Sequence, residues 1–139
     1  MVILRFFFVY GPGQRESMLI PRLIRSVEEG RPITMRGSNG IRINPIHVRD
    51  AARCVDFALK LDDSQKINVA GSEEVTIREM GECIGHLLGK RPVLEHQDVK
   101  PRHLVGDIER MCRLLGPPTI SLKEGLTELV GLMDRDRPS

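Results

Sequence analysis

The residues with reactive side chains stand in no arrangement that a catalytic mechanism requires. His47 is a candidate acid or base because histidine side chains titrate near neutral pH. It directly precedes a predicted helix, however, and no serine or cysteine partner is evident beside it. Asp50 suits the N-cap or the first turn of that helix, where free backbone N–H groups stabilise a carboxylate. We interpret both residues as structural.

Charge and cysteine usage exclude several classes of protein. The formal net charge is +2, and the basic residues are scattered among acids, which argues against nucleic-acid binding. Arginine outnumbers lysine and suits contacts with phosphate, but codon bias explains this excess equally well. Three cysteines without CxxC spacing argue against a disulfide framework or a metal site and favour a reducing cytoplasm; they are Cys54, Cys83 and Cys112. No run is long enough for a membrane span, and Arg5 interrupts the N-terminal apolar run that might serve as a signal peptide.

The element that would position a ligand is the N-terminal stretch 2–14. Four of the five aromatic residues lie in it, and Gly11, Pro12 and Gly13 close it. An apolar and aromatic run of this kind predicts a strand buried on both faces of a parallel sheet. Ligands bind where such strands end. The turn has neither the GxxxxGK[ST] nor the GxGxxG pattern of a phosphate loop, so by itself it indicates a turn that can border a ligand.

The rest of the chain predicts helices that alternate with short strands, an α/β class. The predicted helices are 17–29 with Ser17 as the cap, 48–61 or 50–61, 77–88, 107–115 and 121–133, and the strands are 33–35, 67–69 and 92–95. Capping boxes at Thr76–Glu79 and Ser121–Glu124 open two of the helices. For the second helix we expect the buried face to be Ala51, Val55, Ala58 and Leu59. Residues 134–139 are predicted to be a charged, disordered tail.

An ordered series of motifs resembles one known family. The series is 4–14 (LRFFFVYGPGQ), 19–21 (LIP), 46–50 (IHVRD), 68–71 (NVAG) and 106–107 (GD). It resembles the nucleotide-sugar epimerases and dehydratases of the extended short-chain dehydrogenase/reductase family, over their C-terminal half only. The resemblance implies the last strands of a Rossmann-type sheet plus a small α/β substrate-binding subdomain, together residues 1–133. It also implies that the N-terminal cofactor half is missing.

The resemblance also implies a set of substrate-binding residues. Arg42 and Arg102 correspond to arginines that contact the nucleotide phosphates, and Tyr10 and Gly11 lie in the loop that lines the sugar-nucleotide site. Leu19 and Pro21 match a segment that packs on the base, although both also suit a helix core. Arg42 stands one residue before the family position, which Ile43 occupies, and such a shift reverses the face of a strand. A solvated surface arginine is the alternative. Phe8 replaces an asparagine that helps to hold the diphosphate.

The sequence lacks the residue patterns that bind the cofactor and transfer protons in this family. There is no glycine-rich cofactor loop and no Tyr-x-x-x-Lys pair, and position 14, four residues after the only tyrosine, is glutamine. We therefore expect NAD or NADP to bind the full-length enzyme and not this chain alone, with no catalytic and no metal-binding residue here. The predicted function is the substrate-binding part of an NAD(P)-dependent epimerase or dehydratase that dimerises in full-length form. The alternatives are a stand-alone sugar-nucleotide-binding module and a non-functional truncated product.

Overall fold

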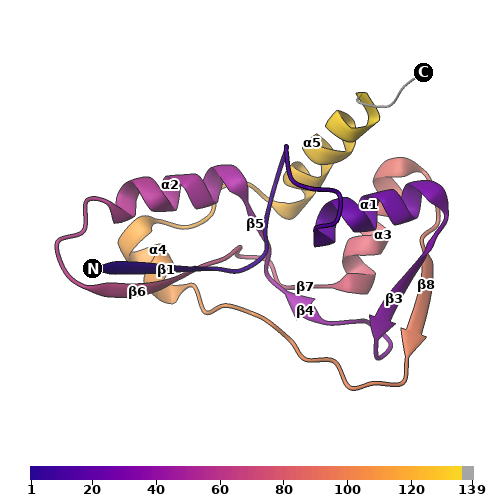
Figure 1. Cartoon of the computed structure of the whole chain (residues 1–139), viewed down its shortest axis with the longest axis horizontal. Coiled ribbons are helices and arrows are strands. Elements are labelled where there is room, and N and C mark those ends of the chain that lie inside the picture. Colours follow the sequence, from indigo (N-terminus) through magenta and orange to yellow (C-terminus); the bar gives the residue numbers. More distant parts are fainter. Residues whose placement is uncertain (136–139) are drawn as a thin grey trace.

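Residues 1–135 are described by a computed structural model, and the fold is α/β as predicted (Figure 1). The strands are β1 (Val2–Phe6), β2 (Val9–Tyr10), β3 (Pro32–Arg36), β4 (Arg42–Ile43), β5 (Ile46–His47), β6 (Gln65–Val69), β7 (Val75–Thr76) and β8 (Val93–Gln97). The helices are α1 (Leu19–Glu29), α2 (Val48–Ala58), α3 (Ile77–Leu88), α4 (Glu109–Leu115) and α5 (Leu122–Arg135). Strands β1–β6, β2–β5 and β3–β8 pair in parallel, and β4–β7 pair antiparallel.

The first lobe is built on the parallel pair β1–β6, with α2 and α4 beside it (Figure 1). Leu4 lies opposite Ile67, and both pack with Cys54 of α2 and Met111 of α4 in one apolar cluster. The expectation of a first strand buried on both faces is wrong for these residues, because Phe6 is 48% exposed. Among residues 1–135, β1 pairs with β6 alone, so its second edge has no partner strand there.

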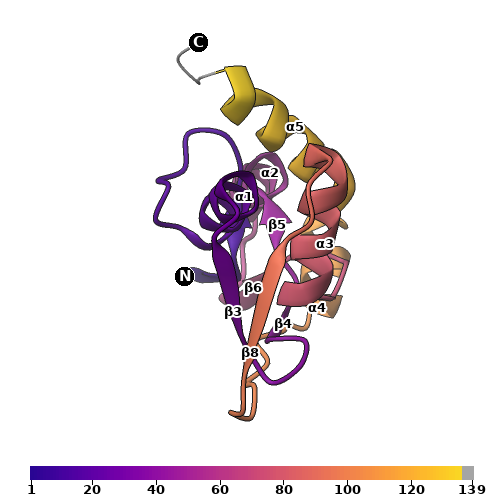
Figure 2. The ribbon, with the colours of Figure 1, turned by 90° about the vertical axis from the view of Figure 1, so that its right-hand side faces the viewer.

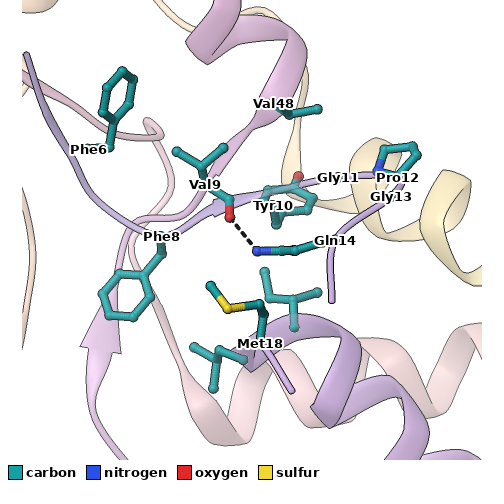
Figure 3. Close-up of a pocket in the computed structure, with 12 residues that line it drawn as sticks. Phe6, Phe8, Val9, Tyr10, Gly11, Pro12, Gly13, Gln14, Met18 and Val48 are labelled. Atoms are coloured by element: carbon teal, nitrogen blue, oxygen red, sulfur yellow. Dashed lines mark hydrogen bonds between the residues drawn. The ribbon is translucent and has the colours of Figure 1, made fainter. Parts of the chain in front are cut away.

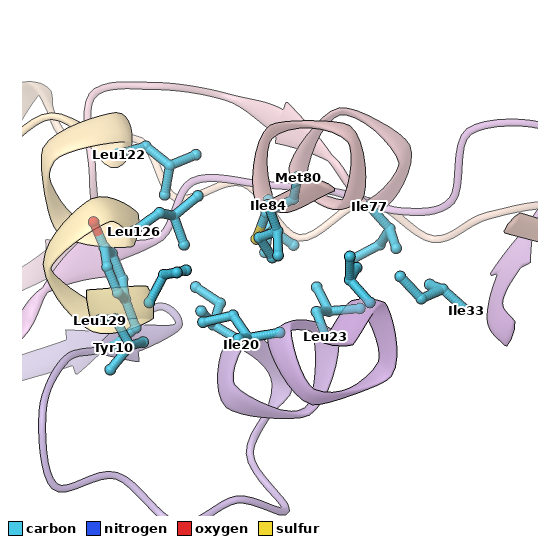
Figure 4. Packing of buried hydrophobic residues seen from close by; sticks show 14 of the residues in the cluster. Tyr10, Ile20, Leu23, Ile33, Ile77, Met80, Ile84, Leu122, Leu126 and Leu129 are labelled. Atoms are coloured by element: carbon cyan, nitrogen blue, oxygen red, sulfur yellow. The ribbon is translucent and has the colours of Figure 1, made fainter. Parts of the chain in front are cut away.

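The second lobe places α1 and α3 beside the pair β3–β8 (Figure 2). The inward side chains of α1, β3, α3 and α5 meet in the larger core cluster (Figure 4). Completely buried aliphatic side chains such as Ile24 and Ile84 each stabilise the fold by about 1.5–3 kcal/mol. Gly85 permits close packing, since a Cβ there would lie 2.6 Å from the Lys90 carbonyl oxygen.

The predicted N-terminal strand breaks at Phe8, where the chain passes from one lobe to the other. Phe7 N still donates to Val69 O of β6 at 2.9 Å, whereas Phe8 O accepts from Ile46 N of β5 at 3.2 Å. Between these two bonds the backbone of Phe8 takes a φ of +49°, the left-handed region. It is the one non-glycine residue with positive φ in the described part of the chain. The change of partner strand requires this turn of the backbone.

Local capping rules hold at some helices and fail at others. The Thr76 and Ser121 caps are confirmed, since Glu79 N donates to Thr76 Oγ1 and Glu124 N to Ser121 Oγ, each at 3.1 Å. Helix α1 starts instead after Met18, without a side-chain cap, so the predicted Ser17 cap is wrong. Asp107 lies one residue before the cap of α4 but accepts from Glu109 N at 2.9 Å.

Helix α2 differs from its prediction in length and in buried face. It ends at Ala58 and not at Leu61, and His47 is its N-cap, with Nδ1 accepting from Arg49 N at 3.1 Å. Cys54 lies inside with Ala51 and Ala58, whereas Val55 is 41% and Leu59 79% exposed. The predicted inward positions of Val55 and Leu59 are therefore wrong, because the sheet contacts a narrower stripe of small side chains.

The connection 98–107 returns from β8 to the first lobe and joins the two lobes (Figure 1). Buried Asn44 holds it in place. Asn44 Nδ2 donates to Gly106 O at 2.9 Å and to Gly71 O at 3.0 Å, and Gly106 N donates to Asn44 Oδ1 at 2.9 Å. Helix α5 runs to Arg135, two residues into the predicted tail, and 136–139 lie outside the described residues. Within 1–135, no helix is both apolar enough and long enough to cross a membrane.

Candidate functional site

A cavity of about 560 Å³ lies at the turn that follows β2 (Figure 3). We call it the turn cavity. Its walls come from three segments, namely 6–14, the start of α1 and the start of α2; the lining residues are Phe6, Phe8, Val9, Tyr10, Gly11, Pro12, Gly13, Gln14, Met18, Leu19, Ile20 and Val48. Gly11 lets the turn approach α2 closely, because a Cβ there would lie 2.4 Å from Val48 Cγ1. No lining side chain is charged at neutral pH, so this cavity suits an uncharged group.

Tyr10 contributes its ring to this cavity and not a reactive hydroxyl. The side chain is 3% exposed, and the ring packs edge-on against His47 with centroids 5.4 Å apart. The hydroxyl lies against α5, where a Cβ on Gly125 would stand 2.0 Å from it (Figure 4). Burial and, after it, nearby carboxylates led by Glu73 raise the pKa of Tyr10 far above its ordinary value. The phenol therefore keeps its proton and cannot act as a base.

A second cavity, of about 400 Å³, lies between α1 and β3. We call it the strand cavity. Leu19 lines both cavities, and Arg22 and Arg36 line the strand cavity alone. Arg22 follows Leu19 by three residues on α1, so the two share one helix face. Neither guanidinium forms an ion pair or hydrogen bond within residues 1–135. The strand cavity therefore contains two unpaired guanidinium groups and lies beside the uncharged turn cavity.

The predicted phosphate contacts Arg42 and Arg102 lie close to each other but line neither cavity. Arg42 N donates to His103 Nδ1 and Leu104 N donates to Arg42 O, both at 2.9 Å. This pairing brings 102–104 alongside β4. Ile43, at the family position, is completely buried, so the half-buried Arg42 side chain points to the other face. Its guanidinium has no partner within 1–135. A phosphate-binding role for both arginines stays a prediction.

The remaining predicted residues divide between cavity wall and core. Tyr10, Gly11 and Leu19 line the turn cavity, whereas Pro21 is buried in the first turn of α1 and lines neither cavity. Arg22 and Arg36 were not singled out from the sequence. The sequence spacing could have indicated their positions, because Arg22 stands three residues after Leu19 on a predicted helix. Arg36 alternates with inward-facing Met35 on β3.

His47 and Asp50 hold neighbouring elements together, as their structural interpretation expects. Nε2 of buried His47 lies 3.5 Å from Glu128 Oε1 of α5, and Arg49 binds the same carboxylate at 2.8 Å. The carboxylate of Asp50 accepts hydrogen bonds from Thr119 N, Thr119 Oγ1 and Ile120 N at 2.8–3.1 Å. Asp50 is thus a first-turn carboxylate of α2 and not its N-cap. Within 1–135 no three His, Cys, Asp or Glu side chains gather as a metal site.

Asp50 makes the stability of the fold depend on pH. Burial raises the pKa of Asp50, but the bonds from Ile120 and Thr119 and the charge of Arg53 outweigh it and leave the pKa below its ordinary value. The pKa of Asp50 is thus lower in the folded protein than in the unfolded chain, where it is about 4. The ionised carboxylate therefore stabilises the fold above about pH 4, and this contribution is lost as the pH falls through the folded-state pKa. At pH 7 we expect Asp50→Asn to lower the free energy of unfolding by about 2 kcal/mol.

The difference should shrink below about pH 4, because the wild-type carboxyl then becomes protonated. Urea denaturation of both proteins across this range measures it. Asp56→Asn, an exposed change on the same helix, is the control and should alter stability by less than about 0.5 kcal/mol. A deficit of Asp50→Asn that is constant with pH would show that the charge of Asp50 does not stabilise the fold.

Comparisons with known proteins agree on one family. Residues 1–70, half of the chain, match the model of the NAD dependent epimerase/dehydratase family. A UDP-glucuronate 4-epimerase of Thermodesulfobacterium geofontis is 32% identical over 92% of this chain. Among solved structures, MoeE5 in complex with UDP-glucuronic acid and NAD aligns with a TM-score of 0.84 at 30% identity over 98% of this chain. A UDP-glucuronic acid 4-epimerase from Bacillus cereus, in complex with the same two ligands, aligns with a TM-score of 0.84 at 29% identity over 96%.

The chain spans less than half of each of these proteins. It covers 41% of the Thermodesulfobacterium enzyme, 48% of the MoeE5 chain and 45% of the Bacillus cereus chain. The α/β fold thus corresponds to part of a Rossmann-type epimerase fold.

Proposed function

Since the chain belongs to the NAD dependent epimerase/dehydratase family, we propose that it forms the substrate-binding portion of a nucleotide-sugar epimerase or dehydratase. The observation that carries this proposal is the pair of cavities that share Leu19. A nucleotide sugar has a charged diphosphate joined to a neutral ring. The free guanidiniums of Arg22 and Arg36 suit the diphosphate, and the uncharged turn cavity suits the sugar. Arg42 and Arg102 line neither cavity, and we propose from the family resemblance alone that they contact phosphate from outside these two cavities.

The described residues do not fit NAD or NADP. No strand–turn–helix among them has glycine spacing for a pyrophosphate, and Tyr10, the only tyrosine, is held as a buried phenol. When bound to the whole enzyme, the cofactor would supply hydride transfer, and the protein would orient it. The residues of this chain bind and orient the substrate. In this proposal the remaining half of the enzyme supplies the cofactor site and the proton-transfer residues, and this chain alone is inactive.

Exposed apolar surface beside the turn cavity supports the proposal that another half of the enzyme packs on this chain. Phe6 at the end of β1 is 48% exposed. Val48 and Val55 of α2 and Leu59, which follows this helix, also expose apolar side chains. The second edge of β1 pairs with nothing within 1–135, and such an edge readily accepts another strand. A dinucleotide-binding half that adds a strand to β1 and packs on α2 covers all of this surface. Co-elution with the corresponding half of a relative tests this arrangement, and separate elution contradicts it.

Calorimetric titration with UDP tests the proposed function. We expect the chain to bind UDP, and Arg22→Met to weaken this binding about tenfold, the loss of one charge-assisted hydrogen bond. Methionine keeps the length and apolar stem of the side chain, so packing on Leu19 is retained. Arg113→Met, a change at an exposed position of α4 that lines neither cavity, is the matched control and should bind as the wild type does. Equal affinities of the two variants would contradict a diphosphate site in the strand cavity.

A further inference from the structure

The turn between β3 and β4 (Figure 1) contains a pair of residues that favours spontaneous chemical modification. Asn39 is exposed and is directly followed by Gly40. Because glycine has no Cβ, its backbone nitrogen can approach the carboxamide carbon of a preceding asparagine without hindrance. The other two asparagines lack such a neighbour. Asn44 precedes a proline, which has no N–H, and Asn68 precedes a β-branched valine.

Both reacting groups of this pair are free of hydrogen bonds within residues 1–135. Neither the carboxamide of Asn39 nor the backbone N–H of Gly40 has a partner there. By contrast, the side chain of Asn44 makes three hydrogen bonds, and Asn68 Nδ2 donates to Asp107 O at 3.2 Å. Gly40 is buried but lines the strand cavity, so water reaches it from that side. Attack by Gly40 N on Asn39 therefore requires no hydrogen bond of these two groups to break.

The start of α3 lies beside this turn and contacts the main-chain carbonyl of Asn39. Asn39 O accepts from Arg78 N at 3.0 Å, and the Arg78 guanidinium donates twice to Ser38 O, at 2.8 and 2.9 Å. Backbone N–H groups at a helix N-terminus carry partial positive charge. A donor in this position stabilises the negative charge that develops on a carbonyl oxygen when water attacks its carbon. Attack by water is thus favoured at the main-chain carbonyl of Asn39.

We propose that Asn39 is a site of spontaneous deamidation whose main product is isoaspartate. Gly40 N gives its proton to a solvent base and attacks Asn39 Cγ. The Cγ–Nδ2 bond breaks, ammonia leaves and a five-membered imide forms. Water then adds to the main-chain carbonyl carbon of Asn39, whose bond to Gly40 N breaks. The chain continues through Cβ and Cγ, and the former carbonyl becomes a carboxylate. In sum, water is consumed and ammonia released, without oxidation or reduction.

The longer backbone of isoaspartate changes the strand cavity. Gly40 is packed so closely that a Cβ there would lie 2.7 Å from Ile77 Cβ, so lengthening the chain before it displaces it. Gly40 and Arg36 stand on the two sides of the turn, and both line this cavity. The new carboxylate also adds negative charge to the turn. Isoaspartate should therefore weaken the binding of a diphosphate. This consequence rests on the proposed function, whereas the deamidation itself does not.

Incubation of the purified chain in mildly alkaline buffer tests the modification site. Peptide mass spectrometry should show the exchange of an amide for a carboxylate at Asn39 and at neither Asn44 nor Asn68. Chromatography against synthetic peptides should show isoaspartate in excess of aspartate. Asn39→Gln, the matched control, keeps the carboxamide but would need a six-membered imide, so it should stay unmodified. An unmodified Asn39, or equal modification of Asn68, overturns the proposal. An excess of aspartate overturns the role of the Arg78 N–H group.

Calorimetric titration with UDP tests the consequence for binding. Fresh wild type and fresh Asn39→Gln should bind UDP equally well. After incubation the modified wild type should bind about tenfold more weakly, the loss of one charge-assisted contact, whereas Asn39→Gln should be unchanged. Equal binding before and after modification overturns this consequence and leaves the modification site standing. Failure of the fresh wild type to bind UDP overturns the proposed function, and mass spectrometry still decides whether Asn39 deamidates.

Discussion

Asn44→Ala is expected to lower the free energy of unfolding by about 3–5 kcal/mol. The side chain is 3% exposed and makes three hydrogen bonds, to Gly71 O and to both backbone groups of Gly106. Alanine would leave these three buried backbone groups without a partner, and each such group costs about 1–3 kcal/mol. Urea denaturation monitored by circular dichroism measures the change.

The effect of Asn44 should extend to ligand binding. Its bonds to Gly106 hold the connection 98–107 against β4, and this connection carries Arg102 beside Arg42. Asn68→Ala is the matched control because Asn68 makes one exposed bond, to Asp107 O at 3.2 Å. It should cost less than about 1 kcal/mol. If the two alanine variants lose equal stability, Asn44 does not hold the two lobes together.

Gly125→Ala is the second change with a large expected effect. A Cβ at this position would lie 2.0 Å from Tyr10 Oη and 2.7 Å from two ring carbons. Tyr10 cannot withdraw, because it is buried and packs on His47. Overpacking of this kind typically costs about 1–3 kcal/mol, and here we expect at least about 2 kcal/mol of lost stability even after the gain in helix propensity.

Two further variants isolate the cause. Gly131→Ala lies on the same helix, where a Cβ would meet nothing within 4 Å, and it should stabilise the fold by about 0.8–1 kcal/mol through helix propensity alone. Combining Gly125→Ala with Tyr10→Phe removes the closest atom and should recover part of the loss. Thermal unfolding of the four proteins gives the comparison. A neutral Gly125→Ala would show that α5 does not pack tightly on Tyr10.

Features set by neighbouring residues were predictable from the sequence. Helix 77–88 has the predicted bounds, opens with the predicted Thr76 cap and ends at Gly89 in the left-handed conformation. The Ser121 capping box opens α5 as expected. All three cysteines lie in helices, although only Cys54 is completely buried. Such features depend on hydrogen bonds and side-chain contacts within one turn of the chain, so the local sequence suffices to predict them.

The candidate site was predictable only in part. Tyr10, Gly11 and Leu19 do line the turn cavity, because a turn after a strand places its residues at the sheet end. The free cations next to this cavity belong to Arg22 and Arg36. Spacing places Arg22 beside Leu19 on α1, but it does not tell whether either guanidinium has a partner. Whether a cation lacks a partner is decided only when every segment that packs around it has been placed.

By itself, the sequence determined the α/β class, the family resemblance and the helices whose ends carry their own caps, since these depend on local pattern. Only the tertiary structure decided that the N-terminal strand breaks at Phe8 and that α2 turns Cys54 inward. Only it decided that Asn44 ties residues 71 and 106 to β4. These features depend on which distant strand or helix supplies the partner. That choice is made by the packing of the whole chain, where contacts far apart in sequence override local propensity.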